Sequence, residues 1–218
     1  MTKKYEQIQF LLGLGGQRLV DDARAAEVEM QAFDNAGRRA AGDRLPWRIL
    51  GGVEALIEEE GGLRLKCEHG EAELRWLAPN CLQVRAHPGH GGFEPPFSYA
   101  VAKTEWPEVA LTVTQGAEAV AVQTTTGIYR IGRWPFRIGV ETTDGELICV
   151  DSLGPQFRED GAVRLAMRMH PAEGSYGLGE RASGLNLRGQ RFTLWNTDHI
   201  TYKRGSDPLY YNVAFYMG

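Results

Sequence analysis

Cysteine is scarce in this chain of 218 residues, which contains only Cys67, Cys81 and Cys149. The three are too few and too widely spaced for a disulfide framework, and none belongs to the C-x-x-C pair of a zinc or redox site. We expect three reduced thiols, buried on strands, because free cysteine is among the most buried residue types. A reducing cytoplasm is the simplest compartment for such a chain.

Long apolar runs are also lacking, and a membrane-spanning helix needs about 20 consecutive apolar residues. Near the N-terminus, Glu6, Gln7 and Gln9 interrupt the apolar stretch that a signal peptide would need. Basic clusters are absent as well, since the net charge is −4 and the arginines are scattered. We therefore expect neither a membrane nor a nucleic acid as a partner.

Familiar cofactor and catalytic motifs are missing too. Leu12-Gly-Leu-Gly-Gly16 opens like a dinucleotide loop, yet Arg18 stands where the third glycine of G-x-G-x-x-G belongs. His87 and His90 flank a Pro-Gly turn, but no third ligand converges on them, so we expect no metal and no cofactor. Without the nucleophile elbow G-x-S-x-G, no Ser-His-Asp triad is expected either.

What the sequence does contain, from residue 53 onward, is an apolar period of two. Leu63, Leu65 and Cys67 alternate with charged residues, which is typical of a strand with one wet face. Asp144-Gly145 is the strongest of the turn signals and predicts a hairpin. The alternation recurs in residues 74–76, 82–84, 109–113, 120–122 and 136–140, and most regularly in 163–169.

Short strands at this spacing, without helices long enough to act as crossovers, predict a mostly β chain folded as an antiparallel β-sandwich. Residues 1–50 differ because they are rich in alanine and charge, and the spacing from Ala26 to Phe33 fits a short helix or half a hairpin. We expect an N-terminal extension over residues 1–50, short and helical or irregular. One β-sandwich domain would follow over residues 51–218.

The segment 171–206 breaks the alternation and is rich in glycine, aromatic and acidic residues, which predicts a long, turn-rich loop. Such loops in compact domains are often functional. Aromatic faces beside carboxylates suit a sugar, whose ring offers C–H faces for stacking and hydroxyls for hydrogen bonds. The segment therefore favours the hypothesis of a sugar site.

Three acids of the C-terminal segment are candidates for chemistry, Glu180, Asp198 and Asp207. Hydrolysis of a glycosidic bond needs two carboxylates across that bond, and the sequence does not fix their separation. Each acid also has a structural interpretation. Glu180 would pair with Arg181 or a neighbouring arginine. Asp198 would form an Asx-turn, and Asp207 would start a turn before Pro208.

Three stretches near the C-terminus form a pattern, Tyr176-Gly-Leu-Gly-Glu180, Leu194-Trp-Asn-Thr-Asp198 and Asp207-Pro-Leu-Tyr-Tyr-Asn-Val-Ala-Phe-Tyr216. Together they resemble glycoside hydrolase family 31, the retaining α-glucosidases and α-xylosidases. The resemblance covers residues 53–218 and is specific from residue 176 onward. It implies a galactose-mutarotase-like supersandwich that precedes a (β/α)₈ barrel and extends one loop over the barrel's C-terminal face.

The resemblance also implies roles for individual residues. Asp198 matches a family aspartate that lines the substrate pocket near the leaving-group sugar, so we expect it to bind substrate. Trp195 and Asn196 would shape the loop, and Glu180 with Arg181 would be structural. The nucleophile and the general acid are aspartates of the barrel, which these 218 residues lack. We therefore expect no catalytic residue here and no activity of the chain by itself.

The resemblance thus predicts an N-terminal fragment of an α-glucosidase-type hydrolase, incomplete at its C-terminus. Its partners would be an α-linked oligosaccharide and the catalytic barrel in cis, and its exposed barrel-facing surface would promote self-association. Three alternatives remain: an α-xylosidase, a stand-alone carbohydrate-binding or mutarotase-like sandwich, and a non-enzymatic interaction module. Mutarotation would need a base and an acid in the cleft of the sandwich, and the sequence places no His–Glu pair there.

Overall fold

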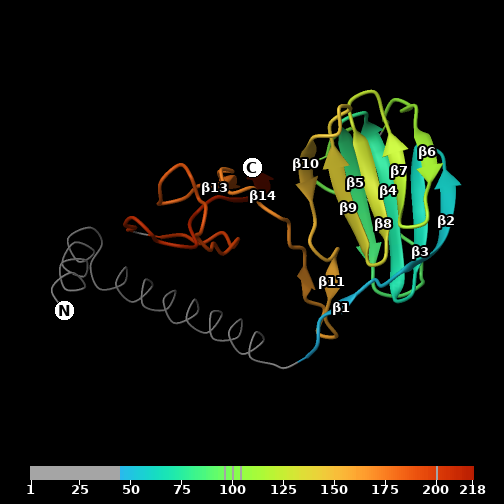
Figure 1. Cartoon of the computed structure of the whole chain (residues 1–218). Coiled ribbons are helices and arrows are strands. Elements are labelled where there is room, and N and C mark those ends of the chain that lie inside the picture. The colour runs from blue at the N-terminus through green and yellow to red at the C-terminus, as the bar shows by residue number, and fades with distance from the viewer. Residues whose placement is uncertain (1–44, 96, 100, 104, 200) are drawn as a thin grey trace. The chain divides into compact units, whose positions relative to one another are not determined.

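The computed structural model describes residues 45–218, except residues 96, 100, 104 and 200. These residues form two compact units, 45–169 and 170–218 (Figure 1). The helix predicted near the N-terminus lies outside the described residues and stays a prediction. Within the described residues, no helix is long and apolar enough to cross a membrane.

All strand pairings of the described residues are antiparallel. The strands are β1 (Arg48–Ile49), β2 (Val53–Glu59), β3 (Gly62–Cys67), β4 (Gly70–Ala78), β5 (Cys81–His87), β6 (Thr112–Gln115), β7 (Ala119–Gln123), β8 (Ile128–Arg133), β9 (Phe136–Glu141), β10 (Leu147–Val150), β11 (Gln156–Phe157), β12 (Val163–Arg164), β13 (Tyr176–Gly179) and β14 (Asn212–Met217).

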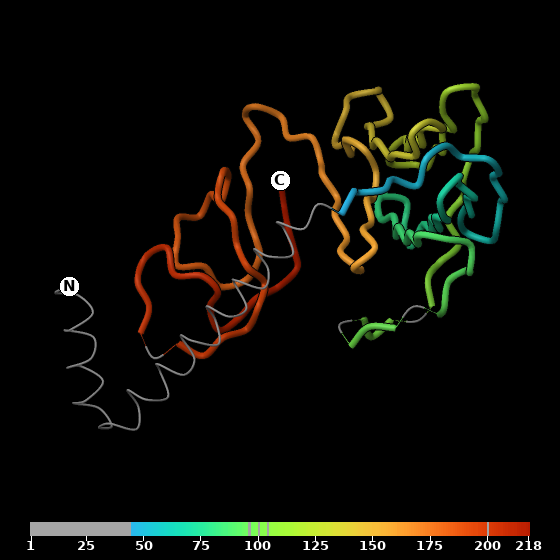
Figure 2. Tube along the Cα trace, turned by 90° about the horizontal axis from the view of Figure 1, so that it is seen from below, coloured from blue at the N-terminus to red at the C-terminus, as the bar shows by residue number. Residues whose placement is uncertain are grey.

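Two sheets face each other in the unit 45–169. One has four strands in the order β2-β3-β4-β5, and the other has five in the order β10-β9-β8-β7-β6. A smaller sheet, β1-β11-β12, belongs to the same unit. Figure 1 shows the two large sheets as stacked layers, and Figure 2 shows the same layers from below. The predicted antiparallel β-sandwich is confirmed.

The inner faces of the two sheets carry the apolar residues of the period-two pattern. Leu63 on β3 lies opposite Leu74 on β4, and both are buried. The rings of Trp76 and Tyr129 meet edge to face across the sheets, with centroids 5.3 Å apart. The buried core comprises Leu50, Leu63, Leu65, Cys67, Ala72, Leu74, Trp76, Val109, Val120, Val122, Tyr129, Ile131, Phe136 and Phe157.

The outer face of the four-stranded sheet is charged. Glu73 on β4 accepts a hydrogen bond from Arg85 on β5 at 3.0 Å, and its carboxylate lies 3.9 Å from Arg64 on β3. The same arginine also bonds Glu59 at 2.8 Å. Because these side chains are partly exposed, each ion pair contributes little stability by itself. They do keep one face of the sheet wet, as the alternation predicted.

The hairpin predicted at Asp144-Gly145 is confirmed. Residues 142–146 join β9 to β10, and the amides of Gly145 and Thr142 donate to the carbonyls of Thr142 and Glu146. Gly145 has a φ of +89°, a backbone conformation that glycine adopts without steric cost. The turn chemistry of the sequence was therefore sufficient to place this connection.

The long strand expected over residues 163–169 is wrong in length. Only Val163–Arg164 forms a strand, β12, followed by one isolated bridge between Asp151 and Met167. Val163, Leu165 and Met167 are 65%, 59% and 47% exposed. The alternation is real, but its apolar side faces a cleft and not a closed core.

The segment just before residue 51 belongs to the same compact unit as the sandwich. Arg48 and Ile49 pair with Phe157 and Gln156 of β11, and Leu50 is buried in the core. The boundary expected at residue 51 stays a prediction. The structure nevertheless places a strand and a core residue before it.

None of the three cysteines forms a disulfide within the described residues, and they differ in exposure. Cys67 on β3 is buried, Cys149 on β10 is intermediate, and Cys81 at the start of β5 is exposed. The expectation of buried thiols is therefore wrong for Cys81, which lies beside the turn between β4 and β5. Burial, together with the charges of Glu54 and Glu68, raises the pKa of the Cys67 thiol to about 11.

We expect a thiol reagent at pH 8 to label Cys81 first and Cys67 only when the protein unfolds. The thiolate is the reactive form, and a raised pKa keeps Cys67 protonated at this pH. Mass spectrometry of a labelling time course measures the order. Counting under denaturing conditions should then find three thiols; a smaller number would reveal a bridge, and equally fast labelling of Cys67 would contradict its burial.

Candidate functional site

The unit 170–218 contains a short strand pair and a long loop. β13 and β14 are antiparallel, with Tyr176 opposite Met217 and Gly179 opposite Asn212. Between them, the described residues from 180 to 211 form no strand or helix. The turn-rich loop expected over residues 171–206 is therefore present, but it runs from residue 180 to residue 211, because residues 176–179 form β13. It carries all three candidate acids.

The loop leaves β13 through three residues with positive φ. The φ angles are +99° at Gly177, +64° at Leu178 and +83° at Gly179. A Cβ atom on Gly177 would lie 2.4 Å from the carbonyl oxygen of Phe215, and one on Gly179 would lie 2.4 Å from that of Tyr211. Both glycines are required by the close approach of β14, so the Gly-Leu-Gly sequence directly shapes the start of the loop.

Arg181 and Asp207 hold the two ends of the loop together. The Arg181 side chain is 5% exposed, and its Nη1 lies 3.2 Å from Oδ1 of Asp207. Its Nη2 donates to the carbonyl of Leu178 at 2.5 Å, and its guanidinium stacks 5.1 Å from the ring centre of Phe192. The other carboxylate oxygen of Asp207 accepts the amide of Thr193 at 2.6 Å. The Arg181–Asp207 ion pair thus connects three parts of the unit, which contain Leu178, Thr193 and Asp207.

Two structural interpretations of the acids change accordingly. Arg181 pairs with Asp207 and not with Glu180, whose side chain is exposed and makes no ion pair within the described residues. Asp207 does more than start a turn, because both of its oxygens accept hydrogen bonds from distant parts of the loop. Local sequence patterns do not predict this pairing, since the two residues are 26 positions apart.

Trp195 and Asn196, the residues expected to shape the loop, lie where the chain passes the start of β14. The Trp195 side chain is 58% exposed, and its carbonyl accepts from the side-chain amide of Asn212 at 2.8 Å. Asn196 Oδ1 accepts from the backbone amide of Asn212 at 2.9 Å. Asn212 was not among the predicted site residues, although asparagine in an otherwise apolar strand is unusual enough to have marked it.

Asp198 is exposed and makes no hydrogen bond with another described residue. An Asx-turn would involve the backbone of residue 200, which lies outside the described residues. The Tyr210 ring packs edge to face against the rings of His199 and Tyr202, with ring centroids 6.4 and 6.0 Å apart. Partial burial raises the pKa of the Tyr210 hydroxyl, and the nearby Asp198, Tyr202 and Glu180 raise it further. Two acids and a group of rings therefore share one surface.

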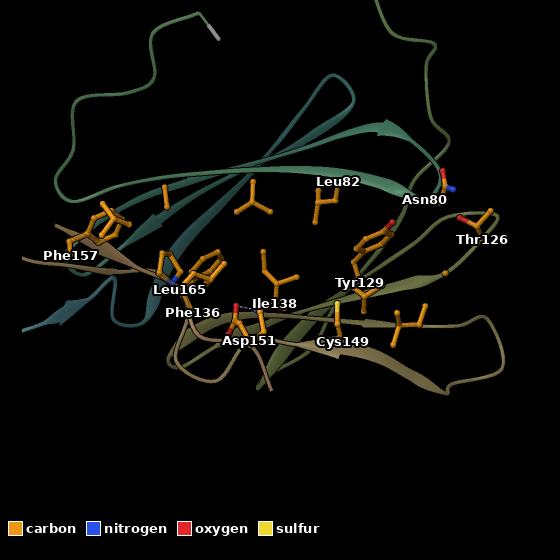
Figure 3. A pocket seen from close by; sticks show the side chains of 18 residues that line it. Asn80, Leu82, Thr126, Tyr129, Phe136, Ile138, Cys149, Asp151, Phe157 and Leu165 are labelled. Carbon is orange, nitrogen blue, oxygen red and sulfur yellow. Dashed lines mark hydrogen bonds between the residues drawn. The ribbon is translucent and has the colours of Figure 1, made fainter. Parts of the chain in front are cut away.

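The unit 45–169 has a separate cleft of about 680 Å³ between its two sheets (Figure 3). One wall comes from β5 and the other from β8, β9 and β10, and residues of β11 and β12 lie along it. The described residues that line it are Asn80, Leu82, Val84, Ala86, Thr126, Gly127, Tyr129, Phe136, Ile138, Val140, Ile148, Cys149, Asp151, Pro155, Phe157, Val163, Leu165 and Met167.

Two polar side chains of this cleft, Asp151 and Tyr129, already have hydrogen-bond partners in the protein. Asp151 is 4% exposed, and its two oxygens accept the backbone amides of Ile138 at 2.8 Å and Gly154 at 3.0 Å. Burial raises the pKa of Asp151 against the opposing effect of these amides. The Tyr129 hydroxyl donates to the carbonyl of Pro79 at 3.1 Å. The described lining residues include no histidine and no glutamate.

The Arg181–Asp207 pair gives a direct test of how the loop is held. We expect Arg181→Ala to destabilise the unit 170–218 by about 2–3 kcal/mol, because it leaves a partly buried carboxylate without its charged donor. Arg191→Ala is the matched control, since Arg191 is exposed. Hydrogen exchange at the amides of β13 and β14 measures the effect. Equal exchange rates in the two variants would contradict a structural role for the pair.

Comparison with known proteins places this arrangement in a family. The profile of the Glycosyl hydrolase 31 N-terminal galactose mutarotase-like domain matches residues 71–218, which is more than half of the chain. The matched range includes the strands of the sandwich from β4 onward, the loop with Asp198, and β14.

Individual relatives agree with this match. Alpha-glucosidase 2 of Bacillus thermoamyloliquefaciens is 26% identical over 171 residues, which are 77% of this chain and 21% of that protein. A family 31 dextranase of Flavobacterium johnsoniae, solved with isomaltotriose, has a TM-score of 0.71 and 23% identity, over 78% of this chain and 21% of its own. The cycloalternan-forming enzyme from Listeria monocytogenes, solved with a pentasaccharide substrate, has a TM-score of 0.57 and 18% identity, over 71% and 15%.

The structural likenesses show a shared fold, and the chain spans about a fifth of the length of the first two relatives. The profile match carries the assignment, since it spans more than half of the chain and includes residues of both units. The chain belongs to glycoside hydrolase family 31, and its residues 71–218 match the N-terminal galactose mutarotase-like domain of that family.

Proposed function

We propose that this chain is the N-terminal domain of a retaining α-glucosidase-type hydrolase and that it contributes Asp198 to substrate binding. The observation that carries the proposal is the exposed Asp198 carboxylate, which has no hydrogen-bond partner among the described residues and lies next to Tyr210. A relative named Alpha-glucosidase 2 supports the reaction class. The dextranase solved with isomaltotriose supports an α-linked glucose oligomer as the substrate.

The surface around Asp198 has the chemistry that a sugar needs. An ionised carboxylate accepts hydrogen bonds from two adjacent hydroxyls, and aromatic faces pack against the C–H groups of the ring. Trp195 and Tyr202 are 58% and 52% exposed and supply such faces. By contrast, the lining of the cleft in the other unit is mostly aliphatic. The loop is therefore the better candidate for a sugar contact.

The bond-breaking carboxylates are assigned to the remainder of the enzyme. The family resemblance implies that the nucleophile and the general acid are aspartates of the barrel, and this chain spans about a fifth of its relatives' length. The exposed rings of Trp195 and Tyr202 support a surface that the barrel covers in cis. Three cysteines without a disulfide in the described residues support a cytoplasmic location.

The purified chain is expected to show no hydrolysis of p-nitrophenyl α-glucoside. Glycoside hydrolysis needs two carboxylates across the scissile bond. An enzyme without both carboxylates loses the bond-breaking step and not only its affinity for the substrate. A discontinuous assay with long incubation measures the residual rate against buffer. Turnover by the chain alone that survives repurification would contradict the division of labour proposed above.

In the full-length enzyme, with this chain joined to its barrel, we expect Asp198→Ala to lower kcat/KM for maltose about ten- to a hundredfold. Hydrogen bonds to charged groups contribute about 1.5–3 kcal/mol each, and every 1.4 kcal/mol is roughly a factor of ten. Aryl glucosides should suffer less, because they present no second sugar. Glu60→Ala, at an exposed turn, is the control. Unchanged maltose turnover in the Asp198 variant would reject the binding role.

A further inference from the structure

The side chain of Asn212 makes an unusual set of contacts at the start of β14. Its Nδ2 donates to the carbonyl of Trp195 at 2.8 Å, to the carbonyl of Leu209 at 2.9 Å and to Oδ1 of Asn196 at 3.1 Å. Its backbone amide donates to the same Asn196 oxygen at 2.9 Å. One residue therefore bonds two consecutive residues of the loop and the segment that precedes its own strand.

The surroundings fix which end of this amide is which. All three partners of Nδ2 are acceptors, so an oxygen in its place would face three oxygens. The Oδ1 of Asn212 then lies on the other side, where it is buried and has no hydrogen-bond partner among the described residues. Burying an acceptor without a donor is unfavourable.

The contacts of Asn212 belong to a longer interaction between residues 195–199 and residues 208–212. The amide of Thr197 donates to the carbonyl of Leu209 at 3.1 Å, and Nε2 of His199 lies 2.8 Å from the carbonyl of Pro208. Residues 195–199 thus run beside residues 208–212, with a bond on each side of Asp198. Asp198 makes none of its own to the described residues, so its position depends on its neighbours.

We infer that Asn212 is a positioning residue for the substrate contact, acting through Asn196 to hold residues 195–199 so that Asp198 points outward. This inference rests on the proposed function only for the sugar contact, since the contacts of Asn212 stand by themselves. Asn212 does not touch the sugar. Its role is to keep the loop from adopting other conformations when the pocket is empty, which favours binding because the loop is already ordered.

Two isosteric substitutions distinguish this role from simple space filling. Asn212→Asp replaces the donor with an oxygen that faces three acceptors, so we expect exchange of the amides in residues 195–199 to accelerate at least about tenfold. Asn196→Asp keeps the oxygen that accepts both Asn212 donors, so exchange should change less than about threefold. The two variants have the same added charge and almost the same volume. Hydrogen exchange of the purified chain measures both, with amides of β7 as the internal reference.

Asn212→Ala separates positioning from folding, because it removes the donors without adding repulsion. Fast exchange confined to residues 195–199, with β13 still protected, supports positioning. Uniform loss of protection across the unit 170–218 overturns it, and so do equal effects of Asn212→Asp and Asn196→Asp.

Activity of the full-length enzyme gives the second readout. We expect Asn212→Ala to lower kcat/KM for maltose, and to cause no further loss when Asp198→Ala is already present, because the two residues act on one contact. Independent, additive losses would overturn the inference. If hydrogen exchange behaves as expected while Asp198→Ala leaves turnover unchanged, Asn212 does hold residues 195–199 but Asp198 does not contact the sugar. Failure of the positioning role and failure of the proposed sugar contact are therefore distinguishable.

Discussion

Each large sheet of this protein has one apolar face, and the fold depends on covering that face. Where the two sheets overlap, residues such as Leu65 and Ile131 are fully buried and the Trp76–Tyr129 contact joins the layers. Where the overlap ends, the same alternation leaves apolar side chains such as Val163 exposed along an open cleft. The hydrophobic effect is non-directional, so burial is decided by what lies opposite a residue and not by the residue alone.

The unit 170–218 is held together by different forces. A single two-stranded ribbon buries too little apolar surface to be stable by itself. Its loop instead depends on polar side chains that each reach several parts of the chain, chiefly Arg181, Asp207 and Asn212. These groups use their hydrogen-bonding capacity within the protein. Asp198 keeps its capacity for a ligand, and this difference between neighbours is what marks it as a candidate for recognition.

Period and turn chemistry were enough to predict the sandwich, because both are local. The Leu63–Cys67 alternation predicts a strand directly, and the Asp144-Gly145 turn predicts a hairpin. The same reasoning failed at residues 163–169, because alternation does not reveal whether a second layer is present to face them. It also missed Asn212 and the partner of Arg181, since those contacts join residues 16 to 26 positions apart. The family resemblance supplied Asp198, which chemistry alone left open between a turn and a ligand contact.

The Gly-Leu-Gly segment allows the geometry of the β13–β14 pair to be predicted from the sequences of related chains. A Cβ atom at Gly177 would lie 2.4 Å from the carbonyl oxygen of Phe215 in β14, and one at Gly179 would lie 2.4 Å from that of Tyr211 just before β14. The backbone on one side therefore occupies the space that a side chain on the other would need. A related chain that carries a larger residue at either position must have moved β14 away or changed the turn. Asn212 begins β14, and Asp207 precedes it and pairs with Arg181. In such a chain, the loop that carries Asp198 would therefore have to be held in a different position. Two glycines thus act as a compact marker for whether this geometry, and not only the fold, is shared.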